Sequence, residues 1–320
     1  MTRPLGQQSW TPGWPPGHDG GASQDPAGEW LPGLSDIESH DPFAVARSGS
    51  RPRWRPASRS AQAGRRALGL DGTPHGWMAV VVCDGQLDDA FVVPLASQAI
   101  ARARPAAVAV DMPVGLVDEA GRDADAAARR LLAGAASTVF TTPPRAVIEA
   151  WRQGEVTSHG EASALAHAVT GTGVSFQAWR LVPKIAEIDQ LAAGWGNGLR
   201  ECHPELAFRQ LTGGDRLPRK RSWDGVMRRR ALLADVGVVL PDDVGGGNRA
   251  APDDVLDAAV CAWVAAGVVE GGALQPHPPQ PRQVDQGQPI AMWTRPPAGC
   301  GATLGASSSS AREPPTHGLG

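Results

Sequence analysis

Four apolar segments and one short helical segment follow one another from residue 66 onward, with turn signals between them. Asp84-Gly85, between the second and third apolar segments, is a strong hairpin signal. A helix ended by Pro105 precedes the last segment, whose nearly continuous apolar residues are typical of a buried strand. The predicted order is β-β-β-α-β, with strands over 66–72, 76–83, 87–95 and 106–113 and the helix over 96–104.

Helical spacing dominates the next part of the chain. Amphipathic segments predict a helical insertion over about 118–197, with helices at 123–133, 147–154, 161–169 and 179–193. A fifth short strand is expected near Gly198, and a helix is expected to begin near Pro204. The chain is thus an α/β protein.

The last strongly periodic segment, residues 251–267, predicts a helix with a clear start. Pro252 suits the first turn, and Asp253 and Asp254 lie where the helix dipole favours negative charge. Asp257 is different, because it lies beyond the first turn beside residues expected to be buried. A carboxylate in that position needs a partner, a shifted pKa or a metal ion.

Both ends of the chain lack hydrophobic periodicity and are rich in Pro, Gly, Ser and Arg. Residues 1–65 and 276–320 are therefore predicted to be disordered tails around a folded unit at 66–275. Whether the first 65 residues are translated is an open question. Without a signal peptide or an apolar run of about 20 residues, no membrane association is expected and the cytoplasm is the expected location.

Charge and cysteine content narrow the classes of site. A net charge of −3 provides no overall attraction to nucleic acid or to an acidic membrane. The four cysteines lie far apart without paired spacing, which argues against a zinc ribbon or a redox pair.

Acidic residues occur at the ends of the predicted strands and on the final helix. Asp71 ends the first strand, Asp111 ends the fourth, and Glu201 lies on the fifth. Asp254 and Asp257 are one turn apart on the final helix. In a β-β-β-α-β core the first and fourth strands are commonly neighbours, so Asp71 and Asp111 are expected to converge. Taken singly, Asp71 before Gly72 is better explained as a turn residue, and Asp111 before Met-Pro as a strand end.

An ordered set of short motifs resembles the domain of unknown function family 429, a predicted RNase H-like nuclease family. The motifs are Gly69-Leu-Asp-Gly with Gly76-Trp77, Asp111-Met-Pro-Val-Gly-Leu116, Ser137-Thr-Val-Phe-Thr-Thr-Pro-Pro-Arg145, Gln177-x-Trp-x-Leu-x-Pro-Lys-Ile185, Glu201-Cys-His-Pro-Glu205 and Asp253-Asp-x-x-Asp-Ala258. The last spacing is similar to the terminal helix of Holliday-junction resolvases. The resemblance covers residues 66–275 and implies an RNase H-like fold with a mixed five-stranded sheet and a C-terminal acidic helix.

Within such a fold, the acids are expected to form a metal site. An all-oxygen ligand set suits Mg²⁺ or Mn²⁺ better than Zn²⁺. Asp71, Asp111 and Asp257 are the expected core ligands, with Asp254 and Glu201 as further ligands or as groups that orient water. His203 has two interpretations, a proton shuttle to the leaving group or, with Pro204, a cap for the following helix.

Contacts to nucleic acid are expected from basic residues and one aromatic residue. The candidates are Lys184, Arg145, Arg219, Lys220, Arg221 and Trp223. Lys184 and Arg145 are equally compatible with salt bridges, and the basic run over 216–230 is also explained by a solvated helix face.

The predicted function is metal-dependent hydrolysis of nucleic-acid phosphodiester bonds. Two alternatives remain: a small-molecule phosphotransferase or ATPase of the same superfold, and a non-catalytic module that binds nucleic acid or protein. DNA or RNA, endonuclease or exonuclease, and oligomeric state are not distinguished by the sequence.

Overall fold

Seven strands form one mixed sheet within residues 65–118 and 121–297, which the computed structural model describes. The sheet order is β3-β2-β1-β4-β5-β9-β6. Its strands are β1 (Arg66–Thr73), β2 (Gly76–Cys83), β3 (Gln86–Val93), β4 (Ala107–Val110), β5 (Leu199–Glu201), β6 (Gln275–His277) and β9 (Met292–Thr294). A separate hairpin in the described residues pairs β7 (Val284–Asp285) with β8 (Gln288–Pro289).

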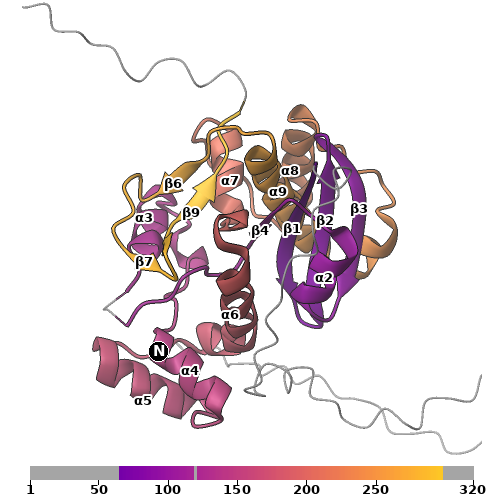
Figure 1. Cartoon of the computed structure of the whole chain (residues 1–320). Helices are drawn as coiled ribbons and strands as arrows, with labels where there is room; N and C mark the ends of the chain where they lie inside the picture. The colour runs from indigo at the N-terminus through magenta and orange to yellow at the C-terminus, as the bar shows by residue number, and fades with distance from the viewer. Residues whose placement is uncertain (1–64, 119–120, 298–320) are drawn as a thin grey trace, which may run out of the picture. The chain divides into compact units, whose positions relative to one another are not determined.

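The helices fall into an inserted group and a C-terminal group (Figure 1). After α2 (Ala96–Ala103), the helices between β4 and β5 are α3 (Asp123–Leu131), α4 (Arg145–Gln153), α5 (His159–Thr170) and α6 (Phe176–Trp195). The helices after β5 are α7 (Pro204–Leu211), α8 (Trp223–Asp235) and α9 (Pro252–Val269). Short 3-10 turns are η1 (Ala136–Thr138), η2 (Gly196–Gly198) and η3 (Gly245–Arg249).

Strand pairing confirms that the first and fourth strands are neighbours. β1 pairs antiparallel with β2 and parallel with β4, and β4 pairs parallel with β5. All four residues of β4 are buried, as expected for a parallel strand covered on both faces. The ends of β1 and β4 therefore lie side by side.

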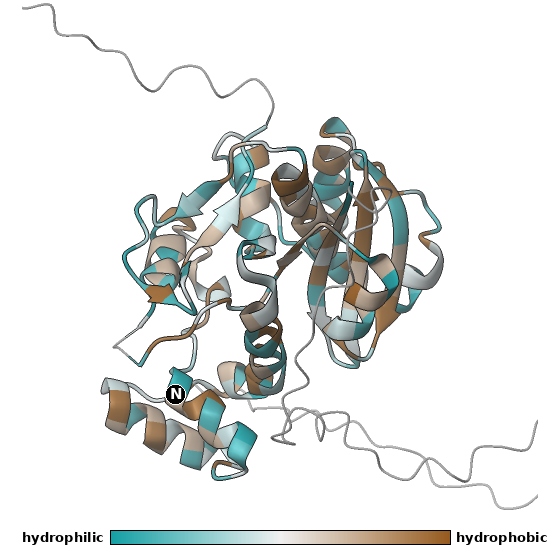
Figure 2. Cartoon of the chain, viewed as in Figure 1, coloured by the Kyte–Doolittle hydropathy of each residue, from teal (hydrophilic) through white to brown (hydrophobic). Residues whose placement is uncertain are grey.

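The two faces of the sheet carry different helices, because side chains along a strand alternate between faces. Ala67, Ala107 and Ala109 face α9, which packs along β1, together with α7 and α8. Leu68 and Val110 face the opposite way, into a cluster with residues of α2, α4 and α6. The α9 ribbon is mostly apolar along its length (Figure 2), in agreement with the burial of most of its residues against the sheet.

Gly69 on β1 sets how closely α9 can approach the sheet. A Cβ at this position would lie 2.0 Å from the Ala258 carbonyl oxygen and 2.2 Å from the Ala262 nitrogen, both backbone atoms of α9. We expect Gly69→Ala to lower the free energy of unfolding by about 3 kcal/mol, the upper end of the usual cost of overpacking. Chemical denaturation measures this change.

Gly160→Ala is a matched control, because a Cβ at Gly160 in α5 would meet no atom within 4 Å. Alanine has the higher helix propensity, so this variant should be unchanged or more stable by up to about 1 kcal/mol. Equal stability of the two variants would show that α9 does not require the close approach at Gly69.

The C-terminal boundary predicted from the sequence is wrong. Residues 276–297 were expected to be disordered, yet β9 pairs with β5 and β6, and Ile290, Met292 and Thr294 are buried. The sheet consequently has seven strands rather than five. The two added strands are β6, with the sequence Gln-Pro-His, and β9, with the sequence Met-Trp-Thr. At three residues each, they are too short to show the alternation of apolar and polar residues that marks a strand. The predicted tails at 1–64 and 298–320 lie outside the described residues.

Among the described residues, no helix combines the length and apolar character needed to cross a membrane.

Candidate active site

Three aspartates from distant parts of the sequence meet on the α9 side of the sheet. Asp71 lies on β1, Asp111 directly follows β4, and Asp257 lies in the second turn of α9. Asp71 and Asp111 have the same strand parity as the alanines that face α9, so all three side chains share one space. Their charges act on one another, and Asp71 and Asp111 are within hydrogen-bonding reach. We call Asp71, Asp111 and Asp257 the aspartate cluster.

Burial changes the acid–base chemistry of this cluster. Asp71 is 7% exposed and Asp257 only 2%. Burial raises the pKa of Asp111 and of Asp257 to about 7, and it raises that of Asp71 well above its ordinary value, with further repulsion from Asp111 and Asp257. Asp257 Oδ1 has no hydrogen-bond partner among the described residues. The cluster therefore needs positive charge in order to ionise fully near neutral pH.

Lys220 supplies a positive charge at this place. Its Nζ lies 2.6 Å from Asp257 Oδ2 and 3.8 Å from Asp253 Oδ2. Burial alone would lower the pKa of Lys220, but Asp257, Asp71 and Asp111 outweigh it and raise that pKa. The sequence suggested Lys220 as a nucleic-acid contact, whereas the structure shows its ammonium turned toward the aspartate cluster.

The start of α9 contributes two further acids. Asp254 is half-buried and adds to the negative charge felt by Asp71. Asp253, which the sequence suggested only as a helix-start residue, is buried and accepts a hydrogen bond from Arg221 Nε at 3.0 Å. Sequence reasoning missed this role because the partner lies 32 residues earlier in the chain.

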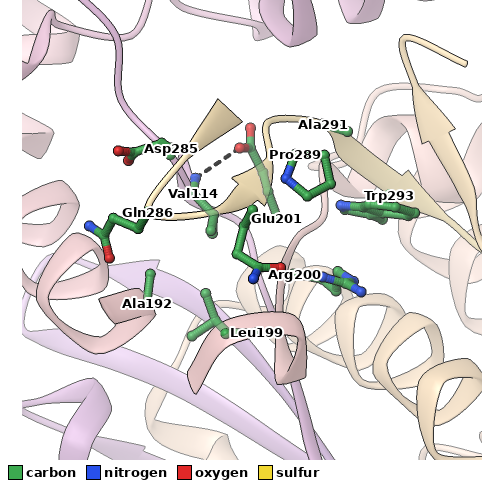
Figure 3. Close-up of a pocket in the computed structure, with 13 residues that line it drawn as sticks. Val114, Ala192, Leu199, Arg200, Glu201, Asp285, Gln286, Pro289, Ala291 and Trp293 are labelled. Atoms are coloured by element: carbon green, nitrogen blue, oxygen red, sulfur yellow. Dashed lines mark hydrogen bonds between the residues drawn. The ribbon is translucent and has the colours of Figure 1, made fainter. Parts of the chain in front are cut away.

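Glu201 lies apart from the aspartate cluster. It pairs in register with Val110, so its side chain lies on the sheet face opposite to Asp111. There it accepts a hydrogen bond from the Val114 nitrogen at 2.8 Å (Figure 3). It also forms a buried ion pair with Arg122. The cavity next to it has a volume of about 20 Å³, room for about one water molecule. The structure thus gives Glu201 a partner other than the aspartates.

His203 and Glu205 approach the cluster from the start of α7. Burial lowers the pKa of His203, and His203 Nδ1 has no partner within the described part of the chain. His203 is the N-cap residue of α7, but its side chain makes no capping hydrogen bond. Glu205 acts electrostatically on Asp111 and Asp257, while its two carboxylate oxygens bind Arg229 at 2.8 and 3.0 Å.

One family model matches a segment that contains every residue of this site: the aspartate cluster, Lys220, His203 and Glu205. The model described as "Protein of unknown function (DUF429)" matches residues 69–283. The chain belongs to the DUF429 family. Comparison with curated proteins gave no match, and comparison with solved structures gave none either. The DUF429 match also extends past residue 275, in agreement with a folded unit longer than the sequence pattern indicated.

Two of the predicted nucleic-acid contacts of this DUF429 protein are engaged within the protein. Lys184 Nζ donates to the Gly76 carbonyl oxygen at 2.5 Å and lies 4.5 Å from the centre of the Trp77 ring. Arg145 forms ion pairs with Asp189 at 3.1 Å and Asp285 at 2.5 Å. Lys184 is thus held by a hydrogen bond and a cation–π contact, and Arg145 by ion pairs, all within the protein.

The basic run of the DUF429 chain divides into internal and exposed members. Arg229 is buried against Glu205, and Arg230 binds the Leu240 carbonyl oxygen. Arg219, Arg221 and Trp223 are exposed, and the Trp223 side chain is 80% exposed. We call these three residues the exposed basic–aromatic patch. It adjoins the aspartate cluster through Lys220, which lies between Arg219 and Arg221 in sequence.

The chemistry of the aspartate cluster fits a hard divalent cation. Its donors are all carboxylate oxygens, and Asp257 Oδ1 is buried without a partner in the described residues. No group of three or more His, Cys, Asp or Glu side chains in those residues is, however, already arranged around a metal position. The nearest positive charge is Lys220 Nζ, so the cluster as it stands is balanced by an ammonium group.

Proposed function

We propose that this DUF429 protein is a metal-dependent nuclease with an RNase H-like fold. The observation that carries the proposal is the convergence of Asp71, Asp111 and Asp257 from β1, β4 and α9. The strand order β3-β2-β1-β4-β5 supports the fold assignment. Within these five strands, only β2 runs in the opposite direction to the others. RNase H-like nucleases carry acids on the first strand, the fourth strand and the last helix.

In this proposal Asp71, Asp111 and Asp257 hold Mg²⁺ or Mn²⁺, and Asp254 stands beside them. When bound, such an ion activates water and stabilises charge on the phosphate oxygens. Glu201 is not included, because it lies on the other sheet face with Arg122. Its role is to hold the loop after β4 in place.

The chain's own residues account for the other needs of phosphodiester hydrolysis. A lowered pKa keeps His203 neutral near pH 7, and a neutral imidazole can take up a proton and return it to the leaving oxygen. Asp71 and Asp257 are nearly closed to solvent, which strengthens their electrostatic attraction for a bound cation. The exposed basic–aromatic patch supplies positive charge and a stacking surface for the substrate.

The direct test is cleavage by the full-length protein. Labelled single-stranded, duplex, hybrid and branched substrates are incubated with Mg²⁺, Mn²⁺ or chelator. Metal-dependent cutting of any of them supports the proposal and names the substrate class. Cutting of none, by a folded protein that metal stabilises, would favour phosphoryl transfer on a small substrate. Absence of both effects would favour a binding module.

Trp223 is expected to contact an unpaired base. Base–aromatic stacking contributes about 1–3 kcal/mol per base, so Trp223→Ala should weaken binding of a single-stranded oligonucleotide about 5- to 150-fold. Fluorescence anisotropy measures this, with Asp257→Asn in the background to prevent cutting. Thermal stability should not change, because the side chain is 80% exposed.

Phe176→Ala is the matched control for Trp223→Ala. Phe176 is also exposed, at 63%, and also begins a helix, but it lies on α6 in the inserted group. Its replacement should leave oligonucleotide binding unchanged. Equal losses in both variants, or a loss in neither, would exclude Trp223 as a base contact.

A further inference from the structure

The Lys220 ammonium occupies the position where the proposed metal site requires positive charge. Its Nζ is 2.6 Å from Asp257 Oδ2 and acts electrostatically on Asp71 and Asp111. The other oxygen of the same carboxylate, Asp257 Oδ1, is buried and has no partner among the described residues. One half of this carboxylate is therefore neutralised by the protein, and the other half is free to accept a ligand.

We propose that Lys220 is a displaceable internal cation: its ammonium balances the metal-free aspartate cluster, and a divalent cation binds when Lys220 withdraws. This inference rests on the proposed metal site but not on cleavage of nucleic acid. An ammonium and a doubly charged ion repel one another strongly at contact distance. A divalent cation bound by both oxygens of Asp257 therefore excludes the contact between Lys220 Nζ and Asp257 Oδ2.

The surroundings of Lys220 allow the side chain to leave without unfolding the site. Its side chain is 39% exposed, so the stem already reaches solvent. Lysine carries its charge on a flexible four-carbon stem and is well hydrated once outside. The backbone beside it is fixed, because the Arg219 carbonyl oxygen accepts hydrogen bonds from the Ser222 nitrogen and hydroxyl at the start of α8. Rotation of the Lys220 side chain is thus sufficient to move its ammonium away from Asp257.

Withdrawal of Lys220 has a consequence for substrate binding. Arg219 and Arg221, its neighbours in sequence, are exposed members of the basic–aromatic patch. An outward-turned Lys220 adds a third positive charge to this patch, next to the loaded site. Metal loading and the ability to hold a phosphate backbone are therefore coupled through one side chain.

Metal affinity without substrate tests the proposal. Mn²⁺ binding by full-length wild type, Lys220→Met and Arg228→Met is measured by titration calorimetry at pH 8. We expect Lys220→Met to bind Mn²⁺ at least about tenfold more tightly, within the usual range of coupling between two sites. Arg228→Met removes an exposed positive charge of α8 that makes no side-chain hydrogen bond or ion pair in the described residues, and it should match wild type. Equal or weaker binding by Lys220→Met would overturn the proposal.

A second measurement uses the unmodified protein and does not depend on how well a variant folds. Lys184 and Lys220 are the only lysines in the sequence. An amine-reactive acylating reagent, read by mass spectrometry, should label Lys220 several-fold faster with saturating Mn²⁺ than with chelator. Lys184, bound to the Gly76 carbonyl oxygen, should show no change. Unchanged Lys220 labelling would exclude its withdrawal.

The outcomes separate this inference from the proposed nuclease activity. Tighter Mn²⁺ binding by Lys220→Met together with no cleavage of any substrate would keep Lys220 as the internal cation and reject the nuclease. Cleavage by wild type together with unchanged or weaker Mn²⁺ binding by Lys220→Met would keep the nuclease and reject the displacement of Lys220.

Discussion

Asp257→Asn should reduce metal-dependent cleavage at least about a hundredfold while the protein remains folded. Loss of a partner that only orients a metal ligand costs about 10- to 100-fold in affinity or activity, and loss of a ligand itself should cost no less. Asparagine keeps the shape of the side chain but removes the charge that attracts a cation. Mn²⁺ affinity and cleavage rate, measured on the same preparation, should fall together.

The fold should tolerate this change because the ionised carboxylate is itself unfavourable in its buried position. Burial raises the pKa of Asp257 to about 7, so a neutral group suits the site better than a charged one. Lys220, which loses its partner, is already 39% exposed and can turn to water. Circular dichroism should show wild-type secondary structure and a melting temperature that is not lowered.

Asp235→Asn is the matched control for Asp257→Asn. Asp235 ends α8, is exposed, and makes no side-chain hydrogen bond or ion pair in the described residues. Its replacement removes the same charge without touching the aspartate cluster, so both Mn²⁺ affinity and cleavage should be retained. Normal Mn²⁺ affinity in Asp257→Asn would remove Asp257 from the ligand set and leave the α9 acid without its proposed role.

The convergence of Asp71 and Asp111 was expected from the order of the predicted elements, whereas the addition of Asp257 was implied by the resemblance to RNase H-like nucleases. Asp71 and Asp111 each end an apolar segment, and the β-β-β-α-β order makes the two strands neighbours, which the pairing of β1 with β4 confirms. Asp257 was distinguished by a position beyond the first turn of a largely apolar helix. The acidic strand ends and the position of Asp257 on its helix are local signals, whereas the neighbouring of the two strands was inferred from the order of elements over residues 66–113.

Glu201 and Lys220 could not be placed in this way, because their partners are distant in sequence. Which face of the sheet Glu201 occupies depends on its register with Val110, 91 positions earlier, and a shift of one residue reverses the face. Lys220 lies in a basic run that resembles a solvated surface, and its partner Asp257 follows 37 residues later. Composition reports the charges but not the pairs they form.

The Ser137–Arg145 motif illustrates the same limit. In the sequence this segment appeared only as one motif of the family resemblance, whereas the structure connects it to a buried charge network. Thr142 Oγ1 accepts a hydrogen bond from Arg122 at 3.0 Å, and the Thr142 nitrogen donates to Asp125 at 2.9 Å. Arg122 in turn pairs with Glu201. The network connects the loop, the start of α3 and β5, on the sheet face away from the aspartate cluster.

Arg122→Met should therefore destabilise the protein strongly without affecting the metal site directly. Arg122 is buried and pairs with Asp125 at 3.3 Å as well as with Glu201. Removing one member of a buried charge network leaves the others without compensation, at a cost of about 3–5 kcal/mol. Chemical denaturation should show this loss, whereas Mn²⁺ affinity measured below the unfolding transition should be retained.

The loss should be larger at pH 8 than at pH 5. Burial raises the pKa of Glu201 to about 7, above its ordinary value, against the opposing effect of Arg122. A raised carboxyl pKa means that stability is present while the group is protonated and is lost as the pH rises through that pKa. Without Arg122 the pKa of Glu201 rises further, so the difference from wild type widens between pH 5 and pH 8.

Arg282→Met provides the comparison that assigns this effect to burial. Arg282 pairs with Asp123 of α3 at 3.3 Å, but its side chain is 83% exposed. An exposed pair contributes at most about 1 kcal/mol, so this variant should remain near wild-type stability at both pH values. A similar small loss in Arg122→Met would mean that water reaches Glu201 and Asp125, and that the network does not hold the Ser137–Arg145 loop against the sheet.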